Sequence, residues 1–433
     1  MNKANLRLIP ALITIAFSGS AAAAGFQLLE QNASGLGNAY AGSAAVAENA
    51  STIFYNPAGM TQLQDIEVST GVTLISATYQ FNNNASSTGV LSGNSDGGTD
   101  GYVPNAYLAW RVTKDFSIGL GIGAPFGLMT QYDSPWQGGA QSEKFQIKTI
   151  NVNPSVAWRA NDWLSIGGGV SYQTIDAEYA RLVSVSSLAF AGTTATLKLN
   201  DTAWGWNVGA LFTLSPATKI GVSYRSTVKY ETTGNVALSG PVAPTANALF
   251  GASSDVKAAV KLPDTFILSG TQKLGDQWEL LGDVSWTGWS SIPKIDIIRT
   301  SGIASGTLAQ TLNTDFRNTW RVAVGANYKL SDAWKLKFGI AYDETPVKGA
   351  TTRLVSLPDN NRTWLSIGTQ WKPAKNTTLD VGATYLLLKD AQINNNQSVA
   401  VVDVSTAAQN RGTVNGTYSD RAFLLGTQLS VAF

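Results

Sequence analysis

The sequence predicts an all-β fold, a 14-stranded antiparallel transmembrane β-barrel with an N-terminal hatch, or plug, inside the lumen. Three observations predict this fold. First, the 433 residues are 44% hydrophobic and 10% aromatic but only 14% charged, whereas ordinary soluble domains are about 25% charged. Second, apolar and polar residues alternate, and after residue 23 no apolar run approaches the about 20 residues of a membrane-spanning helix. Third, short turns alternate with long polar loops.

Residues 1–23 are expected to be a signal peptide that is cleaved on export. Lys3 and Arg7 precede an apolar run from Leu8 to Phe17, and small residues follow up to Ala23. The apolar run is too short to span a bilayer, which argues against a membrane anchor. We therefore expect the mature chain to begin at Ala24.

Residues 24–65 are expected to form the hatch. They are rich in Gly and Ala, carry few charges and precede the first alternating segment, so they fill no strand position. A tail hanging free in solution would be richer in charge and proline, which favours a plug inside the lumen. Residues 66–433 are then the barrel.

The barrel strands show side-chain alternation with a period of two. In the last segment the residues from Phe423 to Phe433 at odd positions are mostly large and apolar, and those between them are smaller or polar. The segment from Trp320 to Tyr328 alternates in the same way. The polar face carries Gly, Ser, Asn and Gln, whereas a soluble sandwich would carry many Lys and Glu there. We therefore expect one face in lipid and the other in the lumen.

The connections between strands predict two different rims. Short turns occur near 113–115, 160–162, 215–218, 275–277, 331–333 and 373–376. Long loops are expected near 83–101, 133–144, 184–202, 239–254, 301–313, 348–358 and 395–415. Outer-membrane barrels have short periplasmic turns and long extracellular loops. Tryptophans near the strand ends fit interfacial girdles, although ordinary packing is the alternative for about half of them: Trp110, Trp158, Trp163, Trp278, Trp334 and Trp371.

Composition excludes several function classes. Lys plus Arg is 30 and Asp plus Glu is 29, so there is no basic excess for nucleic-acid binding. The chain has no Cys and no His, which excludes disulfides, thiol nucleophiles and Ser-His-Asp catalysis. An acid pair such as Asp283 and Asp296 has no convincing catalytic spacing. We expect no enzyme activity, no cofactor and no metal.

Several motifs resemble one family. The stretches from Ala24 to Leu28 and from Ser34 to Tyr40, together with Asn56-Pro57-Ala58, resemble the N-terminal hatch of the FadL family of outer-membrane long-chain fatty acid transporters. That family also includes channels for aromatic hydrocarbons. The resemblance covers residues 24–433 and is weakest in the loops at 83–101 and 239–254.

The resemblance implies uptake through the outer membrane of a Gram-negative bacterium, with the ligand held in an apolar pocket. We expect the uptake to be passive, because the sequence has no nucleotide-binding loop and no evident energy-coupling segment. Arg181 and Arg317 match positions where the family places basic residues that hold the ligand carboxylate. Alternation places both side chains in the lumen, where a lumen arginine paired with an acidic residue is the alternative. Phe26 resembles the family residue whose side chain occupies the binding pocket.

A strand near residues 118–128 is expected to kink. Glycine favours bulges and Pro125 cannot donate a ladder hydrogen bond, and the residues concerned are Gly123, Ala124, Pro125, Phe126 and Gly127. The stretch resembles the kinked strand through which the family releases ligand sideways into membrane lipid, but a bulge that only shapes the barrel is the alternative. In Asn56-Pro57-Ala58, Pro57 fixes a turn and Asn56 can bond its own backbone, so the motif also fits a rigid hatch.

Three function classes remain open. The first is a channel for long-chain fatty acids or, within the same class, for aromatic or other hydrocarbons, and the basic residues favour the acid. The second is a non-selective porin or receptor barrel, and the third is an outer-membrane enzyme. The expected partners are a long-chain fatty acid or similar hydrophobic small molecule and outer-membrane lipids, with no nucleic acid, and we expect a monomer.

Overall fold

The computed structural model describes residues 25–433, so the expected signal peptide lies outside the described residues. Short helices are found at η2 Leu36–Asn38, α2 Thr52–Tyr55, η3 Pro57–Gln62, α3 Leu188–Ala191, α4 Ala243–Phe250, η4 Trp289–Ser291 and α5 Val404–Gln409. The strands are β1 Ile66–Asn83, β2 Asp100–Arg111, β3 Phe116–Gly123, β4 Gly127–Gln131, β5 Lys144–Arg159, β6 Leu164–Leu182, β7 Thr194–Thr213, β8 Thr218–Arg225, β9 Val228–Ser239, β10 Ser254–Leu262, β11 Thr265–Leu274, β12 Trp278–Thr287, β13 Ile295–Arg299, β14 Leu308–Leu312, β15 Thr319–Lys329, β16 Trp334–Asp343, β17 Arg362–Ala374, β18 Thr377–Leu388, β19 Ala391–Asn396 and β20 Thr413–Ala432. None of the helices in this part of the chain is long and apolar enough to cross a membrane.

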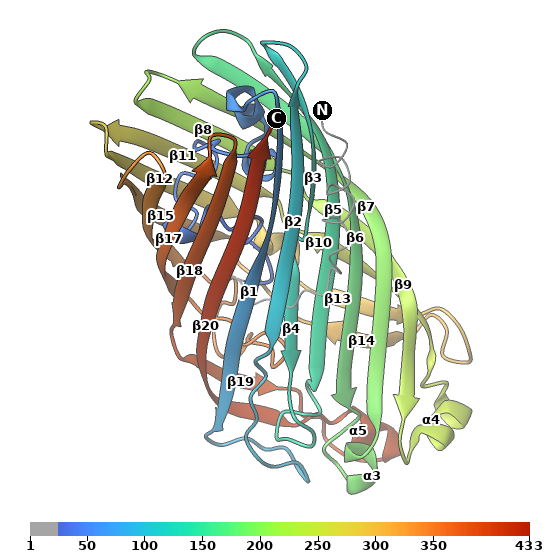
Figure 1. Ribbon diagram of the computed structural model, residues 1–433. Coiled ribbons are helices and arrows are strands. Elements are labelled where there is room, and N and C mark those ends of the chain that lie inside the picture. Colours follow the sequence, from blue (N-terminus) through green and yellow to red (C-terminus); the bar gives the residue numbers. More distant parts are fainter. Residues whose placement is uncertain (1–24) are drawn as a thin grey trace.

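The strands form one closed antiparallel barrel (Figure 1). It closes because β20 pairs with β1 on one side and with β18 on the other. In residues 25–433 the 20 strand segments make 14 barrel strands, because six strands are each interrupted into two segments. The interrupted strands are β3 with β4, β8 with β9, β10 with β11, β12 with β13, β14 with β15 and β18 with β19. The predicted all-β fold and its 14-stranded antiparallel barrel are confirmed.

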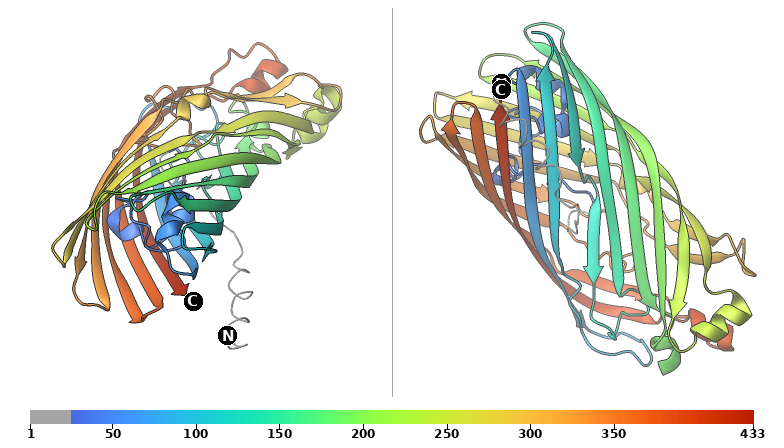
Figure 2. Two further views of the ribbon diagram at one scale, coloured as in Figure 1. Left: turned by 90° about the horizontal axis from the view of Figure 1, so that it is seen from above. Right: turned by 45° about the vertical axis from the view of Figure 1, so that its right-hand side comes forward.

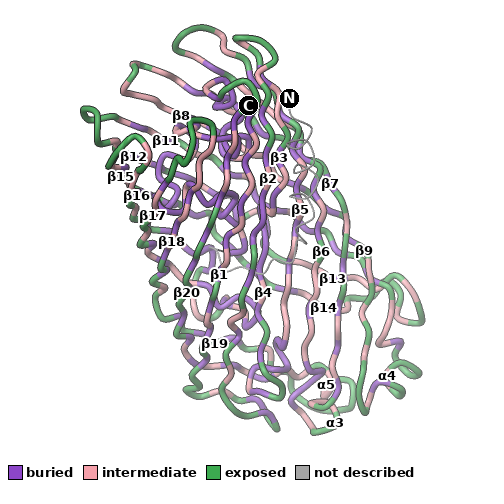
Figure 3. Tube along the Cα trace, viewed as in Figure 1, coloured by how far each residue is buried: buried purple, intermediate pink, exposed green. Residues whose placement is uncertain are grey.

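Side chains alternate between exposed and buried along the strands, as Figure 3 shows. In β20 the apolar side chains of Phe423 and Leu425 are exposed, while Leu424 and Gly426 are buried. The exposed apolar side chains lie on the outer face of the barrel, which contacts lipid. The six tryptophans expected in girdles are all exposed, by 38% to 51%.

The two rims differ as expected. The short turns lie at the end of the barrel that also holds the C-terminus, and α3, α4 and α5 lie among the long loops at the opposite end (Figures 1 and 2). Two predicted loops are too long, because strand β14 (Leu308–Leu312) lies inside the loop expected at 301–313, and strand β7 already begins at Thr194 inside the loop expected at 184–202. Ala195, Leu197 and Leu199 are buried there while Lys198 is exposed, so the alternation continues beyond the apolar part of the strand.

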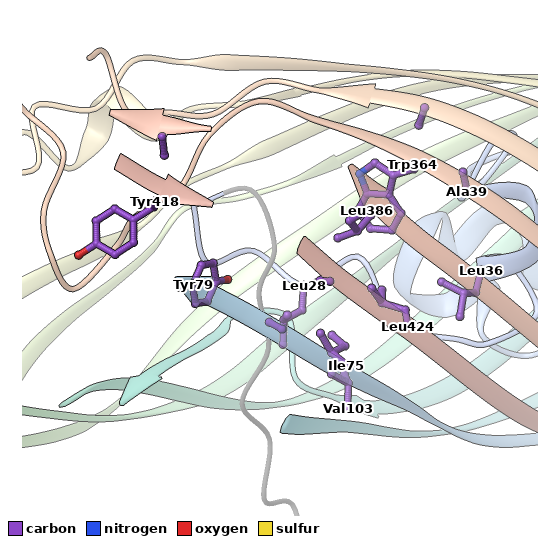
Figure 4. Packing of buried hydrophobic residues seen from close by; sticks show 14 of the residues in the cluster. Leu28, Leu36, Ala39, Ile75, Tyr79, Val103, Trp364, Leu386, Tyr418 and Leu424 are labelled. Carbon is purple, nitrogen blue, oxygen red and sulfur yellow. The ribbon is translucent and has the colours of Figure 1, made fainter. Parts of the chain in front are cut away.

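Residues 25–65 lie within the barrel and are mostly buried (Figure 2). Their helix η2 contacts β16, β17 and β18, and η3 contacts β5, β6 and β7. Figure 4 shows Leu28 and Leu36 of this segment among Ile75, Val103 and Leu424 of the wall. Burying these apolar side chains favours a fixed position for the segment.

Glycine on the inner face lets the N-terminal segment approach the wall closely. A Cβ atom at Gly339 of β16 would lie 2.1 Å from the carbonyl carbon of Asn38. A Cβ atom at Gly221 of β8 would lie 2.0 Å from the carbonyl oxygen of Ala44. Any other residue would require the backbone of the segment to shift.

Candidate functional site

A cavity of about 920 Å³ lies inside the long-loop half of the barrel. Its walls come from β6, β7, β9, β13 and β14 and from the segments around α4 and α5. Apolar side chains cover much of it, among them Leu197, Val236, Ile297 and Leu312. Small-molecule sites are typically about 300–1,000 Å³ and mostly apolar, so this cavity has the size and character of a ligand pocket.

Three arginines line this cavity: Arg181 of β6, Arg299 of β13 and Arg411 before β20. Each guanidinium donates to neutral oxygens. Arg181 Nε donates to Gln310 Oε1 at 3.0 Å, Arg299 Nη1 to the Ala252 carbonyl oxygen at 2.6 Å, and Arg411 Nη1 to Gln397 Oε1 at 3.3 Å.

No carboxylate compensates these three charges. Among residues 25–433, no ion pair includes Arg181, Arg299 or Arg411. The acidic residue in the cavity lining is Asp315, and it pairs instead with Lys348 at 2.6 Å. The cavity therefore combines apolar walls with a net positive charge, which suits an amphiphile with an anionic head.

The two arginines expected from the sequence are not brought together. Arg181 lines the cavity, as alternation predicts, but Arg317 is exposed and is absent from the lining. Its Nε donates to the Thr345 carbonyl oxygen at 3.1 Å. The inward placement predicted for Arg317 is wrong because β15 begins only at Thr319, and Phe316 is the neighbour that packs inward.

Phe26 is buried in an aromatic cluster with Phe126 and Trp289. Its ring centroid lies 4.8 Å from that of Trp289 and 6.1 Å from that of Phe126. Phe316 adds a fourth ring, 5.8 Å from Trp289. Phe26 does not line the 920 Å³ cavity but belongs to a separate apolar cluster.

Apolar contacts connect the cavity to this cluster. Phe145, Ala177 and Ile295 pack against the cluster that contains Phe26. The same three side chains pack against a second cluster whose members Tyr179 and Leu197 line the cavity. A continuous chain of apolar side-chain contacts thus runs from the cavity to Phe26 and Phe126.

The strand that contains Pro125 is interrupted where a kink is expected. Both β3 and β4 pair with β5, but the five residues from Gly123 to Gly127 lie opposite four residues of β5, from Asn151 to Lys148. This is a bulge of one residue. Among the described strands β2 pairs with β3 and not with β4, so the ladder on that side ends at Ile122.

The N-terminal segment forms hydrogen bonds with the backbone groups at the kink. Leu28 N donates to the Pro125 carbonyl oxygen at 2.8 Å, and Gly127 N donates to the Phe26 carbonyl oxygen at 2.9 Å. The side chain of Gln31 accepts from Ala124 N at 3.0 Å and donates to the Ala124 carbonyl oxygen at 2.7 Å. Residues 26–31 therefore make the contacts at the kink that a neighbouring strand would make elsewhere in the wall.

Asn56-Pro57-Ala58 ties the segment to β7. Asn56 Oδ1 accepts from Ala58 N at 3.1 Å, the expected bond to its own backbone. Asn56 Nδ2 donates to the carbonyl oxygens of Ala44 at 2.7 Å and Ala210 at 2.9 Å. The motif thus joins two parts of the segment and the wall.

An ion network fixes the same segment on the opposite wall. Lys337 Nζ lies 2.6 Å from Glu48 Oε1 and 2.9 Å from Asp380 Oδ1, and its side chain is 2% exposed. Lys335 Nζ lies 3.2 Å from Glu48 Oε2. Burial opposes ionisation of Glu48, but the charges of Lys337 and Lys335 hold the pKa of this carboxyl below its usual range.

Glu30 is a buried carboxyl without a direct partner. It is 0% exposed, and neither carboxylate oxygen has a hydrogen-bond partner. Burial raises the pKa of Glu30 to about 7, and the charges of Arg362 and Arg321 oppose the rise. Glu30 therefore titrates within the physiological range.

Sequence reasoning missed three residues of this region. Arg299 follows Ile295 and Ile297 in an alternating segment, so its inward direction could have been found from the pattern. Arg411 lies in a loop and Trp289 in the short helix η4, where no periodicity exists to place a side chain.

Comparison with known proteins places these features in context. Residues 14–433 match the family model described as outer membrane protein transport protein (OMPP1/FadL/TodX). The "Long-chain fatty acid transport protein" of Salmonella typhi is 30% identical over 443 residues, which cover 96% of each chain. "Outer membrane protein P1" of Haemophilus influenzae is 30% identical over 475 residues and covers both chains fully.

Two solved structures share the fold. A FadL homologue from Pseudomonas aeruginosa superposes with a TM-score of 0.82 at 20% identity, covering 94% of this chain and 99% of the other. The toluene transporter TbuX of Ralstonia pickettii gives a TM-score of 0.68 at 16% identity, covering 94% and 100%.

Proposed function

Because the chain belongs to the outer membrane protein transport family (OMPP1/FadL/TodX), we propose that this outer-membrane barrel is a passive channel for long-chain fatty acids. The relatives named for long-chain fatty acid transport support this proposal. The observation that carries it is the set of three uncompensated arginines in the 920 Å³ apolar cavity.

The chemistry of a fatty acid matches both features of the cavity. Each methylene that moves from water into an apolar pocket contributes about 0.8 kcal/mol. An arginine can donate two parallel hydrogen bonds to one carboxylate, so Arg181, with Arg299 and Arg411, holds the head group. Arg317 has no part in this proposal, because it does not line the cavity.

The proposed route continues from the cavity through these apolar contacts towards the kink. Phe26 lies at the end of the contacts in this conformation, so the ligand displaces its ring before leaving. Residues 123–127 then form a lateral exit to outer-membrane lipids, and residues 26–31 close it in the conformation described here. In this proposal residues 24–65 act as a hatch whose first turn moves, while Asn56-Pro57-Ala58 stays anchored, and the barrel works as a monomer.

Equilibrium binding to the detergent-purified protein tests the proposal. The ligands are palmitate, its methyl ester and toluene, and the variants are Arg181→Gln, Arg411→Gln and Arg317→Gln. Loss of one charge-assisted contact costs about 1.5–3 kcal/mol, so we expect Arg181→Gln and Arg411→Gln to weaken palmitate binding by about tenfold or more. Binding of the methyl ester should not change in either variant.

Arg317→Gln is the matched control, because it removes the same charge outside the cavity lining. Equal binding of palmitate and its ester to the wild type would contradict carboxylate recognition. If toluene also binds, that result indicates a general hydrocarbon channel, and if none of the three ligands binds, a porin or receptor barrel.

A further inference from the structure

A line of aromatic side chains marks the membrane interface on the long-loop side of β8, β11, β12 and β15. Tyr224 lies opposite Phe266, Phe266 opposite Trp286, and Trp286 opposite Trp320 in the strand register. Trp278, near the short-turn rim, is eight residues from Trp286 along β12. With about 3.3 Å per residue and the usual strand tilt, that distance is about 20 Å across the membrane, close to the apolar height of an outer-membrane barrel.

Two lysines face each other on β9 and β10, the continuations of β8 and β11, five residues beyond Tyr224 and Phe266. Lys229 of β9 lies directly opposite Lys261 of β10, and Val228 lies opposite Leu262 between the lysine pair and the aromatic line. Val228 and Leu262 are buried, so by alternation both lysines lie on the outer face. Directly opposed residues have Cβ atoms about 4.5–5.5 Å apart, and like charges in such a pair are destabilising.

The nearby acidic residues do not neutralise the pair. Glu231 and Asp255 share this outer face, and a third lysine, Lys257, lies opposite Thr233. In residues 25–433 none of the three lysines has an oxygen of a carboxylate within ion-pair distance. Asp201 Oδ2 accepts instead from the backbone N of Glu231 at 2.8 Å.

We propose that Lys229 and Lys261, with Lys257 beside them, bind a phosphate group of a phosphorylated glycolipid in the outer leaflet. The pair lies at headgroup depth, where long lysine side chains extend along apolar surface towards the polar layer. A phosphate between two ammonium groups removes their repulsion and makes charge-assisted hydrogen bonds to both. The depth favours a lipid headgroup over free phosphate. The site lies on the outer wall, so it is independent of the transported ligand.

Native mass spectrometry of the detergent-purified barrel tests this site with three probes: lipid A, lipid A from which both phosphates have been removed, and inorganic phosphate. The variant is Lys229→Gln with Lys261→Gln. The control is Lys372→Gln with Lys375→Gln, which removes the same charge from two exposed residues at the short-turn rim. A lysine near an anionic lipid contributes about 1 kcal/mol, so the double variant should bind lipid A about tenfold or more weakly than the wild type and the control.

Three results would overturn the proposal. One is equal retention of lipid A by the double variant and the control. The second is equally tight binding of the dephosphorylated lipid to the wild type. The third is binding of inorganic phosphate that matches lipid A in affinity and in its loss in the double variant, because the ligand would then be free phosphate.

Thermal unfolding gives a second and independent readout. In detergent without lipid, Lys229→Gln should raise the unfolding temperature, because it removes the repulsion between the two lysines. In detergent with lipid A the order should reverse, since the wild type gains the bound phosphate. An unfolding temperature of the variant that stays above the wild type in both conditions contradicts the site.

Discussion

Two regions of the lumen hold cationic side chains in opposite ways. At the contact between the N-terminal segment and the wall, Lys337 has two carboxylates within 3 Å and is almost fully buried. In the long-loop half, Arg181 and Arg411 donate hydrogen bonds only to neutral oxygens and border a cavity of about 920 Å³. Around the N-terminal segment, by contrast, the cavities are about 40 Å³ each.

The difference distinguishes charges that are paired within the fold from charges that we assign to the ligand in the proposed function. A buried ion pair whose partners are complete holds two elements in register, and its loss leaves uncompensated buried charge. A cation that borders a cavity and has no counter-ion can still form an ion pair with an anionic ligand. The basic residues in one half of the lumen are therefore paired with carboxylates, whereas those in the other half border a cavity without a counter-ion.

The largest expected effect concerns the compensated region. Lys337→Met leaves Asp380 buried without its cation and leaves Glu48 with Lys335 alone, and breaking a buried pair in this way costs about 3–5 kcal/mol. We expect the free energy of unfolding, measured by urea denaturation in lipid vesicles, to fall by that amount. The control is Lys329→Met, which removes the exposed partner of Asp332 and should leave stability unchanged. A similar small effect from both variants would contradict the structural role of Lys337.

The next prediction concerns the pH dependence of stability for two carboxyls of the N-terminal segment, Glu30 and Glu48. The pKa of Glu30 is raised to about 7 in the folded protein from an ordinary value near 4.5. A raised pKa in the folded state contributes stability that is present below about pH 4.5 and lost as the pH rises through 7. The free energy of unfolding of Glu30→Gln, relative to that of the wild type, should therefore increase by about 2–3 kcal/mol between pH 5 and pH 8. Glu48 has a lowered pKa, so its contribution is present at neutral pH and is lost only in acid. A difference between wild type and Glu30→Gln that is independent of pH would contradict the buried neutral carboxyl.

A third effect tests the close packing of the N-terminal segment. Gly339→Ala places a methyl group against the backbone of Asn38, and overpacking of this kind costs about 1–3 kcal/mol. Gly282→Ala is the control, because a Cβ atom there meets nothing within 4 Å. The unfolding temperature of both variants is measured from the heat-induced change in electrophoretic mobility of the folded barrel. Equal unfolding temperatures would show that the segment does not rest against β16.

The smallest expected effect lies in the cavity. Arg411→Met removes a half-buried charge that has no counter-ion, so stability should stay within about 1 kcal/mol of the wild type or rise. Affinity for palmitate should fall in the same variant. Calorimetric unfolding with and without palmitate measures both quantities, and a large loss of stability in the absence of ligand would show that Arg411 is structural.

Much of the fold could be predicted from local pattern. The outward positions of Phe423 and Val322 follow from a period of two, and the interruption near Pro125 follows from a residue that cannot join a ladder. The same reasoning failed for Arg317, since alternation holds only while the chain is a strand and β15 begins two residues later. The start of β7 was missed because polar residues outside the membrane alternate with small apolar ones that are easily read as a loop.

The sequence by itself determined the barrel, its strand number and the direction of most wall side chains, because each depends on residues that are neighbours along one strand. Tertiary structure alone decided which groups meet in the lumen. Arg181, Arg299 and Arg411 come from β6, from β13 and from a loop before β20, and barrel closure brings them to one cavity. The pairing of Phe26 with Phe126 and of Glu48 with Lys337 likewise requires the N-terminal segment to lie inside the closed wall, a long-range contact that no local period encodes.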